Sequence, residues 1–429
     1  MRLSSLDSNS TISTAKLRQS NSLRLDFSWT LIGNLIYRGC QWGMLMALTK
    51  LTSVSDVGTF VLGLAIVAPI IAFSELQLRG VQASDAQDSH SFGDYLGLRL
   101  TSLVFVLLIS TGIAFLFYRE WTIIAVIFFT AISKSIESIS DIVYGCFQKN
   151  MRMDKMGKSF AYKGLLSLFL VVIAVWLTHS IIWALAIMAV CWLAILICYD
   201  LPQAASFGPI KPHFNKHNLW TLVKTAAPLG MVMALVSFQS NIPRYFVETY
   251  LGKVALGYFG AVSYIIVAGS TIVMALGQAA VPRFAQYYVQ NINAFKTLLI
   301  KMVLLVTSLG IVMVMAGAFM GKWFLTLIYT AEYAANYDVF MWLLVTCAVT
   351  FIASIFGYAV TACRQFKMQV PQMLLIISAL IITSFILVPR YGLKGAAWAM
   401  LISTIIGICG WLLLINSCLR KKYLNEACH

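Results

Sequence analysis

The segment Gly164–Tyr199, GLLSLFLVVIAVWLTHSIIWALAIMAVCWLAILICY, runs for 36 residues without an Asp, Glu, Lys or Arg. A membrane-spanning helix needs about 20 mostly apolar residues, because in lipid every backbone polar group must be hydrogen-bonded within the segment. The segment is therefore long enough for two spans. The polar triplet Thr178-His179-Ser180 near its middle predicts the turn between them.

The same pattern extends along the chain, which is 60% apolar and 11% charged with a mean hydropathy of +0.83. No ordinary soluble domain exposes so little polar surface. Two further stretches are apolar enough to span but contain ionisable residues, Phe27–Leu48 and Trp121–Phe147. The sequence thus predicts an all-α integral membrane protein with about twelve transmembrane helices. The other uncharged stretches are Val57–Ser74, Leu100–Tyr118, Thr225–Pro243, Val254–Pro282, Met302–Gly321, Val339–Cys363, Met368–Pro389 and Gly395–Leu419.

Lys and Arg fall predominantly in the tails and in every second loop of this twelve-span layout. The positive-inside rule then places both termini in the cytoplasm. The formal charge of +15 is explained mostly by this topology. Because the basic residues form no single basic domain, we expect no nucleic-acid partner. The nine cysteines include no C-x-x-C pair and imply no disulfide framework.

The loop between Asp200 and Leu219 contains three prolines and divides the chain near its middle. Six spans on each side make both halves begin in the cytoplasm, so any repeat would be parallel, and two six-helix lobes related in this way would leave a central cavity between them. We therefore expect a disordered cytoplasmic tail (1–26), an N-terminal six-helix lobe (27–199), a cytoplasmic linker (200–219), a C-terminal six-helix lobe (220–418) and a cytoplasmic tail (419–429).

Two predicted spans carry polar stripes. Arg38 lies near the middle of the first, on one helical face with Thr30, Asn34 and Gln41. A charge at mid-membrane costs roughly 2.5–3.5 kcal/mol on insertion scales, so it calls for a reason. The fourth span has Lys134, Glu137, Ser138, Asp141, Gly145 and Gln148 at helical spacing, and Lys134 can pair with Glu137. Two interpretations stay open for these residues: structural ion pairs between helices, or the lining of a wet cavity.

Other polar residues are more ambiguous. Glu75 and Lys224 lie near the ends of predicted spans, where a cavity mouth and lipid-headgroup depth explain them equally well. The sequence Gly157-Lys158-Ser159 lacks the first glycine of a phosphate-binding loop. His213 and His217 have no acidic or Cys partner nearby in sequence, and a solvated loop explains them. Asp85, Asp88 and Asp94 with His90 suit a metal-nucleotide site, but the loop is short and no large extramembrane domain accompanies it.

Two short segments carry a family resemblance. Glu75-Leu76-Gln77-Leu78-Arg79-Gly80-Val81-Gln82, followed by Phe92-Gly93-Asp94-Tyr95-Leu96-Gly97-Leu98-Arg99, resembles the junction of the second and third helices in bacterial lipopolysaccharide and capsule repeat-unit flippases. Tyr391-Gly392-Leu393-Lys394-Gly395-Ala396-Ala397-Trp398-Ala399 is similar to the entry into their last helix. These belong to the polysaccharide transporter family of the multidrug/oligosaccharidyl-lipid/polysaccharide exporter superfamily.

The resemblance implies a flippase in the bacterial inner membrane. It would carry an O-antigen, capsule or exopolysaccharide repeat unit on undecaprenyl pyrophosphate to the outer leaflet by alternating access, coupled to H⁺ or Na⁺. A polysaccharide polymerase and a chain-length regulator are the implied partners. The cavity residues for the diphosphate would be Arg38, Lys134, Asn34 and Gln41. Glu137, Asp141 and Glu75 would serve ion coupling, and Arg79 and Lys224 the cavity mouth.

Two other functions stay open at this point. A drug/cation antiporter of the same superfamily would need an acidic cavity, against which Arg38 argues. A membrane polysaccharide polymerase or glycosyltransferase would need a sizeable extramembrane loop, which the sequence lacks. We expect no catalytic residue, no metal and no organic cofactor, and hence a protein that is not an enzyme.

Overall fold

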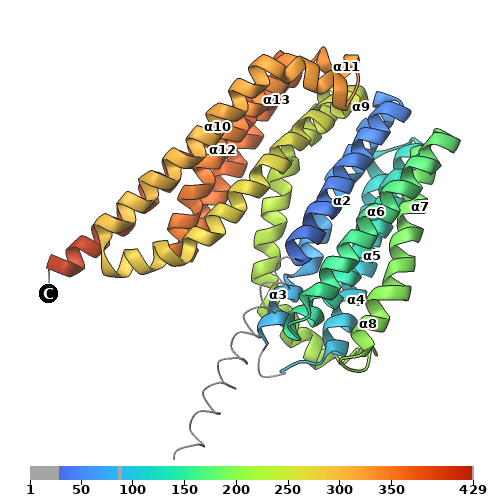
Figure 1. Cartoon of the computed structure of the whole chain (residues 1–429), viewed down its shortest axis with the longest axis horizontal. Coiled ribbons are helices and arrows are strands. Elements are labelled where there is room, and N and C mark those ends of the chain that lie inside the picture. The colour runs from blue at the N-terminus through green and yellow to red at the C-terminus, as the bar shows by residue number, and fades with distance from the viewer. Residues whose placement is uncertain (1–28, 86–88, 428–429) are drawn as a thin grey trace, which may run out of the picture. The chain divides into compact units, whose positions relative to one another are not determined.

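The computed structural model describes residues 29–85 and 89–427, which are helical almost throughout and contain no strand (Figure 1). The predicted tail of residues 1–26 lies outside the described residues. A first helix covers residues 29–51. It is followed by α2 (Val54–Glu75), α3 (Leu78–Ser84), α4 (Phe92–Phe117), α5 (Trp121–Lys149), α6 (Met153–Thr178), α7 (Ile181–Ile195), the π-helix η1 (Leu196–Asp200), α8 (Leu201–Ala205), α9 (Lys216–Gln290), α10 (Ile292–Ile328), α11 (Ala331–Ala334), α12 (Tyr337–Ala362) and α13 (Phe366–Ala427).

Nine helices within the described residues are long and apolar enough to cross a membrane. Two of them, α9 and α13, contain a glycine with non-helical backbone angles, Gly252 with φ 82° and Gly392 with φ 60°, so each consists of two helices. With these two counted twice and the helix of residues 29–51 added, the chain is consistent with twelve spans. The predicted turn is confirmed: α6 ends at Thr178, His179 is left-handed with φ 47°, and α7 begins at Ile181. The protein is an all-α, multi-pass membrane protein, as predicted.

The chain forms two compact units. The first consists of Met1–Leu51 and Ile70–Ala234, and the second of Thr52–Pro69 and Leu235–His429, so α2 and α9 each contribute to both. The predicted linker of residues 200–219 belongs to the first unit, where it begins with the end of η1 and with α8 and finishes inside α9.

In the first unit, α5 is the central helix. It packs against α3, α4 and α7, and α6 packs against α7. The helix of residues 29–51 lies against α6 at small residues: a Cβ on Gly33 would overlap the backbone of Gly157, and one on Gly157 would overlap the backbone of Trp29. This close approach buries Tyr37 and Cys40 on the packed face of the helix.

In the second unit, the start of α2 lies against α9 through another pair of glycines, Gly58 and Gly257. A Cβ on either would overlap the backbone of the facing helix. A core of Phe284, Phe295, Phe351 and neighbouring apolar residues joins the second half of α9 to α10, α12 and the end of α13. Exposed side chains on these helices are largely apolar, as lipid-facing surfaces require.

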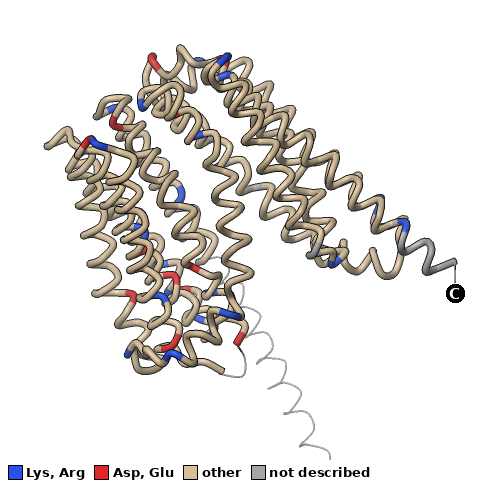
Figure 2. The backbone as a smooth tube through the Cα atoms, turned by 180° about the vertical axis from the view of Figure 1, so that it is seen from behind, with Lys and Arg blue, Asp and Glu red and all other residues tan. Residues whose placement is uncertain are grey.

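Charged residues gather at helix ends, with one further group inside the first unit (Figure 2). Since charge within a span is costly, that group is where the chemistry of the protein is to be sought.

Candidate functional site

Arg79 is positioned by a break in the second span. α2 ends at Glu75, and Leu76 and Gln77 adopt left-handed backbone angles, with φ 50° and 52°. Such angles are uncommon for residues other than glycine and mark a forced turn. α3 then packs against α5, where Gly145 permits the approach because a Cβ there would meet Arg79 and Gln82. The break and the glycine together bring the Arg79 side chain onto α5.

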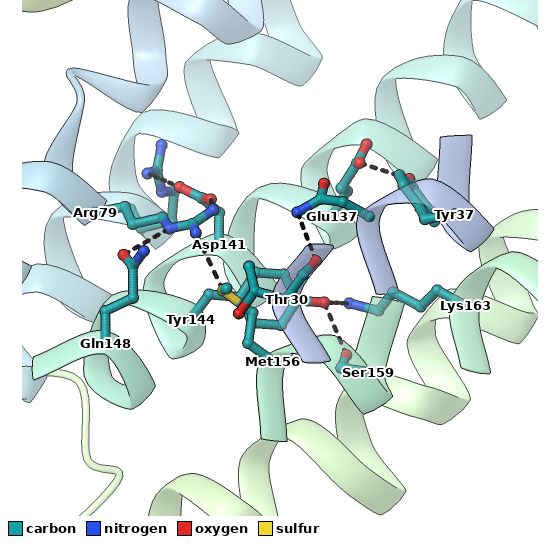
Figure 3. Close-up of polar contacts among 12 residues, drawn as sticks. Thr30, Tyr37, Arg79, Glu137, Asp141, Tyr144, Gln148, Met156, Ser159 and Lys163 are labelled. Atoms are coloured by element: carbon teal, nitrogen blue, oxygen red, sulfur yellow. Dashed lines mark hydrogen bonds and ion pairs between the residues drawn. The ribbon is translucent and has the colours of Figure 1, made fainter. Parts of the chain in front are cut away.

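The Arg79 guanidinium is held from three sides (Figure 3). It donates to Asp141 at 3.1 Å, to Gln148 at 2.9 Å and to the Met156 sulfur at 3.1 Å. The side chains of Arg79 and Asp141 are about a quarter exposed, at 27% and 26%. Asp141, for which the sequence indicated no partner, therefore pairs with an arginine of another helix. The contacts of Arg79 fix its planar guanidinium in one orientation.

A second arginine shares the same carboxylate. Arg99 of α4 is fully buried, pairs with Asp141 at 3.9 Å and donates to the Ser74 carbonyl at 3.3 Å. Its Nε and one terminal nitrogen have no hydrogen-bond partner among the described residues. In the sequence, Arg99 stands out only as the last residue of the second segment quoted for its family resemblance, at the start of a predicted span. No sequence signal distinguishes it from a loop arginine, because its burial depends on α5 packing over it.

The predicted pairing of Lys134 with Glu137 is confirmed, with Nζ and Oε2 at 2.7 Å. Glu137 also accepts a hydrogen bond from Tyr37 at 2.6 Å, which links α5 to the helix of residues 29–51 (Figure 3). The Lys134 ammonium lies 5.6 Å from the centre of the Trp192 ring. We call Arg79, Arg99, Lys134, Glu137 and Asp141 the α5 cluster.

A separate ion pair is completely buried where α6 meets η1. Lys163 and Asp200 are 2.8 Å apart, with side chains 1% and 0% exposed. Lys163 also donates to Tyr144 at 3.0 Å, and Ser159 bonds both Tyr144 and Asp200. Every charged atom of this pair has a partner and none is accessible, so we assign it a structural role. The pair could not be predicted from the sequence, because both residues lie at the ends of apolar runs, where solvated charges are expected.

The remaining predicted residues lie outside the α5 cluster, with Asn34, Arg38 and Gln41 on the helix of residues 29–51 and Lys224 on α9. Arg38 is exposed and makes no hydrogen bond or ion pair within the described residues. Asn34 donates to the carbonyl of Thr30, and the Gln41 amide nitrogen is buried without a hydrogen-bond partner in that part of the chain. Lys224 is exposed, 5.4 Å from the Trp220 ring. No hydrogen bond or ion pair in the described chain joins Arg38 or Lys224 to the α5 cluster.

Acidic residues in the loop after α3 and in the first turn of α4 form local hydrogen bonds. Asp94 forms a capping box with Ser91 at the start of α4 and accepts a hydrogen bond from Asn218 at 3.2 Å. Burial raises the pKa of the Asp85 carboxyl, but the backbone N–H groups of Ser89 and His90 donate to it and hold that pKa below its ordinary value. Asp88 lies outside the described residues. Among the residues described, no group of three His, Cys, Asp or Glu could hold a metal ion.

The segment before α9 lies across the start of α4. The His213 backbone N–H donates to the Gly93 carbonyl at 2.8 Å, and its ring is 3.1 Å from the Ser91 hydroxyl. A Cβ on Gly93 would overlap Lys211, and one on Gly97 would overlap the His213 carbonyl. These glycines, which belong to the segment quoted above for its family resemblance, are therefore needed for backbone-to-backbone contact.

The family model described as "Polysaccharide biosynthesis protein" matches residues 23–288, more than half of the chain. The chain belongs to the polysaccharide biosynthesis protein family. It is 26% identical over 394 residues to the capsular polysaccharide biosynthesis protein CapF of Staphylococcus aureus, covering 90% of this chain and 97% of that protein. The matched region includes the whole α5 cluster.

This member of the family shares its fold with known transporters. It is similar to a multidrug resistance MATE family transporter of the MOP superfamily in its inward-facing conformation, with a TM-score of 0.70, 12% identity and coverage of 92% of this chain and 99% of that one. It is also similar to the lipid II flippase MurJ in its inward closed conformation, with a TM-score of 0.68, 14% identity and coverage of 90% and 87%. These proteins with the same fold are transporters and a flippase rather than enzymes, as expected from the sequence.

Proposed function

We propose that this protein translocates an undecaprenyl-pyrophosphate-linked oligosaccharide, the repeat unit of an O-antigen, capsule or exopolysaccharide, from the cytoplasmic to the outer leaflet by alternating access. Family membership and the relative named for capsule biosynthesis support a role in polysaccharide assembly. The fold shared with a lipid II flippase supports movement of a lipid-linked saccharide.

The observation that carries the proposal is the arginine pair on Asp141. A diphosphate leaving the headgroup layer needs cationic hydrogen-bond donors within the membrane, and a guanidinium fork offers them in the geometry of phosphate oxygens. Arg79 is partly exposed and already oriented by Gln148 and Met156. In the proposed mechanism, the diphosphate replaces Asp141 as the partner of Arg79, while buried Arg99 retains the carboxylate.

The predicted cavity residues would contact the diphosphate one after another. Arg38, exposed and without a described partner, would make the first contact with the diphosphate, flanked by Asn34 and Gln41. Lys134 would contact the diphosphate next, once its ammonium group separates from the Glu137 carboxylate. Lys224 would lie at the mouth.

Coupling to H⁺ or Na⁺ is proposed at the carboxylates Glu137, Asp141 and Glu75. Each elementary charge that crosses 100 mV supplies about 2.3 kcal/mol, which would bias the cycle toward export. Both termini are proposed to be cytoplasmic, which reporter fusions at the C-terminus test. A polysaccharide polymerase and a chain-length regulator are the proposed protein partners.

The test is genetic complementation with leaflet-specific detection of the precursor. A deletion strain should accumulate lipid-linked oligosaccharide on the cytoplasmic leaflet and lose surface polysaccharide, and Arg79→Ala and Arg38→Ala should fail to restore export. Arg152→Ala is the matched control, because Arg152 is half exposed and pairs with neighbouring Asp154 outside the α5 cluster. Normal surface polysaccharide in the deletion strain refutes the proposal. Sensitivity to cationic dyes without a glycan defect would instead assign an antiporter.

A further inference from the structure

The first unit contains an apolar groove that the proposed transport site does not use. It has a volume of about 550 Å³ and is lined by the end of α2, by α4 between Leu98 and Ile109, and by α9 between Lys216 and Ala227. Several of its wall residues, including Phe73 and Phe105, are exposed at 45% and 59%. The hydroxyls of Thr101 and Ser102 bond to carbonyls of their own helix, so this part of the wall is apolar in effect.

The length of the groove matches one membrane leaflet. The stretch of α4 from Leu98 to Ile109 and that of α9 from Lys216 to Ala227 each rise about 16 Å at 1.5 Å per residue. The hydrocarbon core of a bilayer is about 30 Å thick, so the groove spans roughly half of it. An acyl chain of a lipid in one leaflet fits this length, whereas a polyprenyl carrier is much longer than the groove.

Polar groups gather at one end of the groove, where α4 and α9 begin side by side through the contact of Gly97 with His213. Lys216 lines the groove there, is exposed and has no ion-pair partner in the described chain. Trp220, one turn further along α9, is 60% exposed and carries Lys224 against its ring. Exposed tryptophan and lysine at a helix start are typical of headgroup depth.

A buried hydroxyl, that of Ser74, lies at the same end of the groove. Ser74 lines the groove, is only 8% exposed, and its Oγ makes no hydrogen bond within the described residues. The hydrogen bond from Arg99 to the Ser74 carbonyl places it near the Leu98 end. The hydroxyl oxygen lies beneath the groove surface, so the polar group that this end of the groove offers to a ligand is the exposed Lys216.

We propose that this groove binds an anionic glycerophospholipid of the surrounding membrane, with an acyl chain along α4 and α9 and the phosphate at Lys216. Because lipid tails fill any apolar groove in a bilayer, selectivity must come from the headgroup. A second groove of about 500 Å³, lined by α6, α7 and η1, has no basic residue in its wall and provides an internal comparison. The proposal does not depend on the transported substrate.

Native mass spectrometry of the full chain in detergent tests it, with phosphatidylglycerol and phosphatidylcholine of identical acyl chains as probes. The protein should retain phosphatidylglycerol preferentially. Lys216→Ala should weaken that binding about fivefold, the effect of one basic residue near a lipid phosphate, and leave phosphatidylcholine binding unchanged. Val223→Trp, which fills the groove, should reduce retention of both lipids.

Two control variants should behave like the unmodified chain. Lys322→Ala removes another lysine that lies beside an aromatic ring, 5.4 Å from Tyr337, but outside the groove. Val190→Trp fills the second groove instead. The proposal is overturned if Lys216→Ala retains phosphatidylglycerol as before, if Lys322→Ala weakens it equally, or if stoichiometric undecaprenyl phosphate displaces it.

Discussion

Asp141→Asn separates the structural contribution of the shared carboxylate from that of an ordinary surface pair. The substitution keeps the shape of the side chain but removes the charge that Arg79 and Arg99 both face. The Arg79 pair is about a quarter exposed, so its loss alone should cost about 1 kcal/mol. Arg99 is fully buried and would keep the Ser74 carbonyl and the charge of nearby Glu75, so the cost should fall at the lower end of the about 3–5 kcal/mol of an uncompensated buried charge. Since the Arg99 pair is long, at 3.9 Å, we expect a total near 3 kcal/mol.

The assay is thermal unfolding of the purified protein in detergent. A loss near 3 kcal/mol should lower Tm by about 6–12 °C, taking the response of a unit of 150–250 residues. Asp154→Asn is the matched control: Asp154 accepts two hydrogen bonds from Arg152 at 2.8 and 3.0 Å, but Arg152 is half exposed, so the shift should be at most about 1 kcal/mol. Adding Arg99→Met to Asp141→Asn should restore much of the loss. Equal shifts for the two Asn variants would refute the assigned burial of Arg99.

Two further predictions concern packing in the first unit. Asp200→Asn should destabilise the folded protein by about 3–5 kcal/mol and lower the folded yield in fluorescence-detected size-exclusion chromatography. The double variant Lys163→Met with Asp200→Leu should recover that yield. A double variant with no better yield than the single one would contradict a purely structural pair. Gly97→Ala should push the His213 backbone off α4 and speed proteolysis between residues 205 and 216, while Gly112→Ala, with open space around it, should not; equal proteolysis of both variants would argue against the contact.

Hydropathy predicted the helices well because a span is a local property of about 20 residues. The turn at Thr178–Ser180 and the Lys134–Glu137 pair follow from spacing within one segment, and both are present. Arg99, Lys163 and Asp200 were not recognised as buried. Each lies near the end of an apolar run. The sequence pattern there is the same whether the charged side chain faces solvent, lipid headgroups or a packed helix.

The break at Leu76–Gln77 was equally invisible to sequence, since neither residue favours a left-handed conformation. It is imposed by the packing of α3 on α5, and it decides where Arg79 lies. Arg79 was consequently predicted at a cavity mouth, and its contacts with Asp141 and Gln148 could be identified only from the structure. The cavity role of Arg38, Lys134 and the carboxylates stays a prediction that mutagenesis must test.

The most direct test of the proposed function is reconstitution of the purified chain into vesicles that carry an undecaprenyl-pyrophosphate-linked oligosaccharide in both leaflets, with an impermeant glycosidase outside. Vesicles with the protein should lose the oligosaccharide from both leaflets, and Arg79→Ala vesicles, like protein-free ones, from the outer leaflet alone. If the unmodified protein leaves the inner-leaflet pool intact with and without an imposed H⁺ or Na⁺ gradient, the chain is not a flippase for this class of lipid.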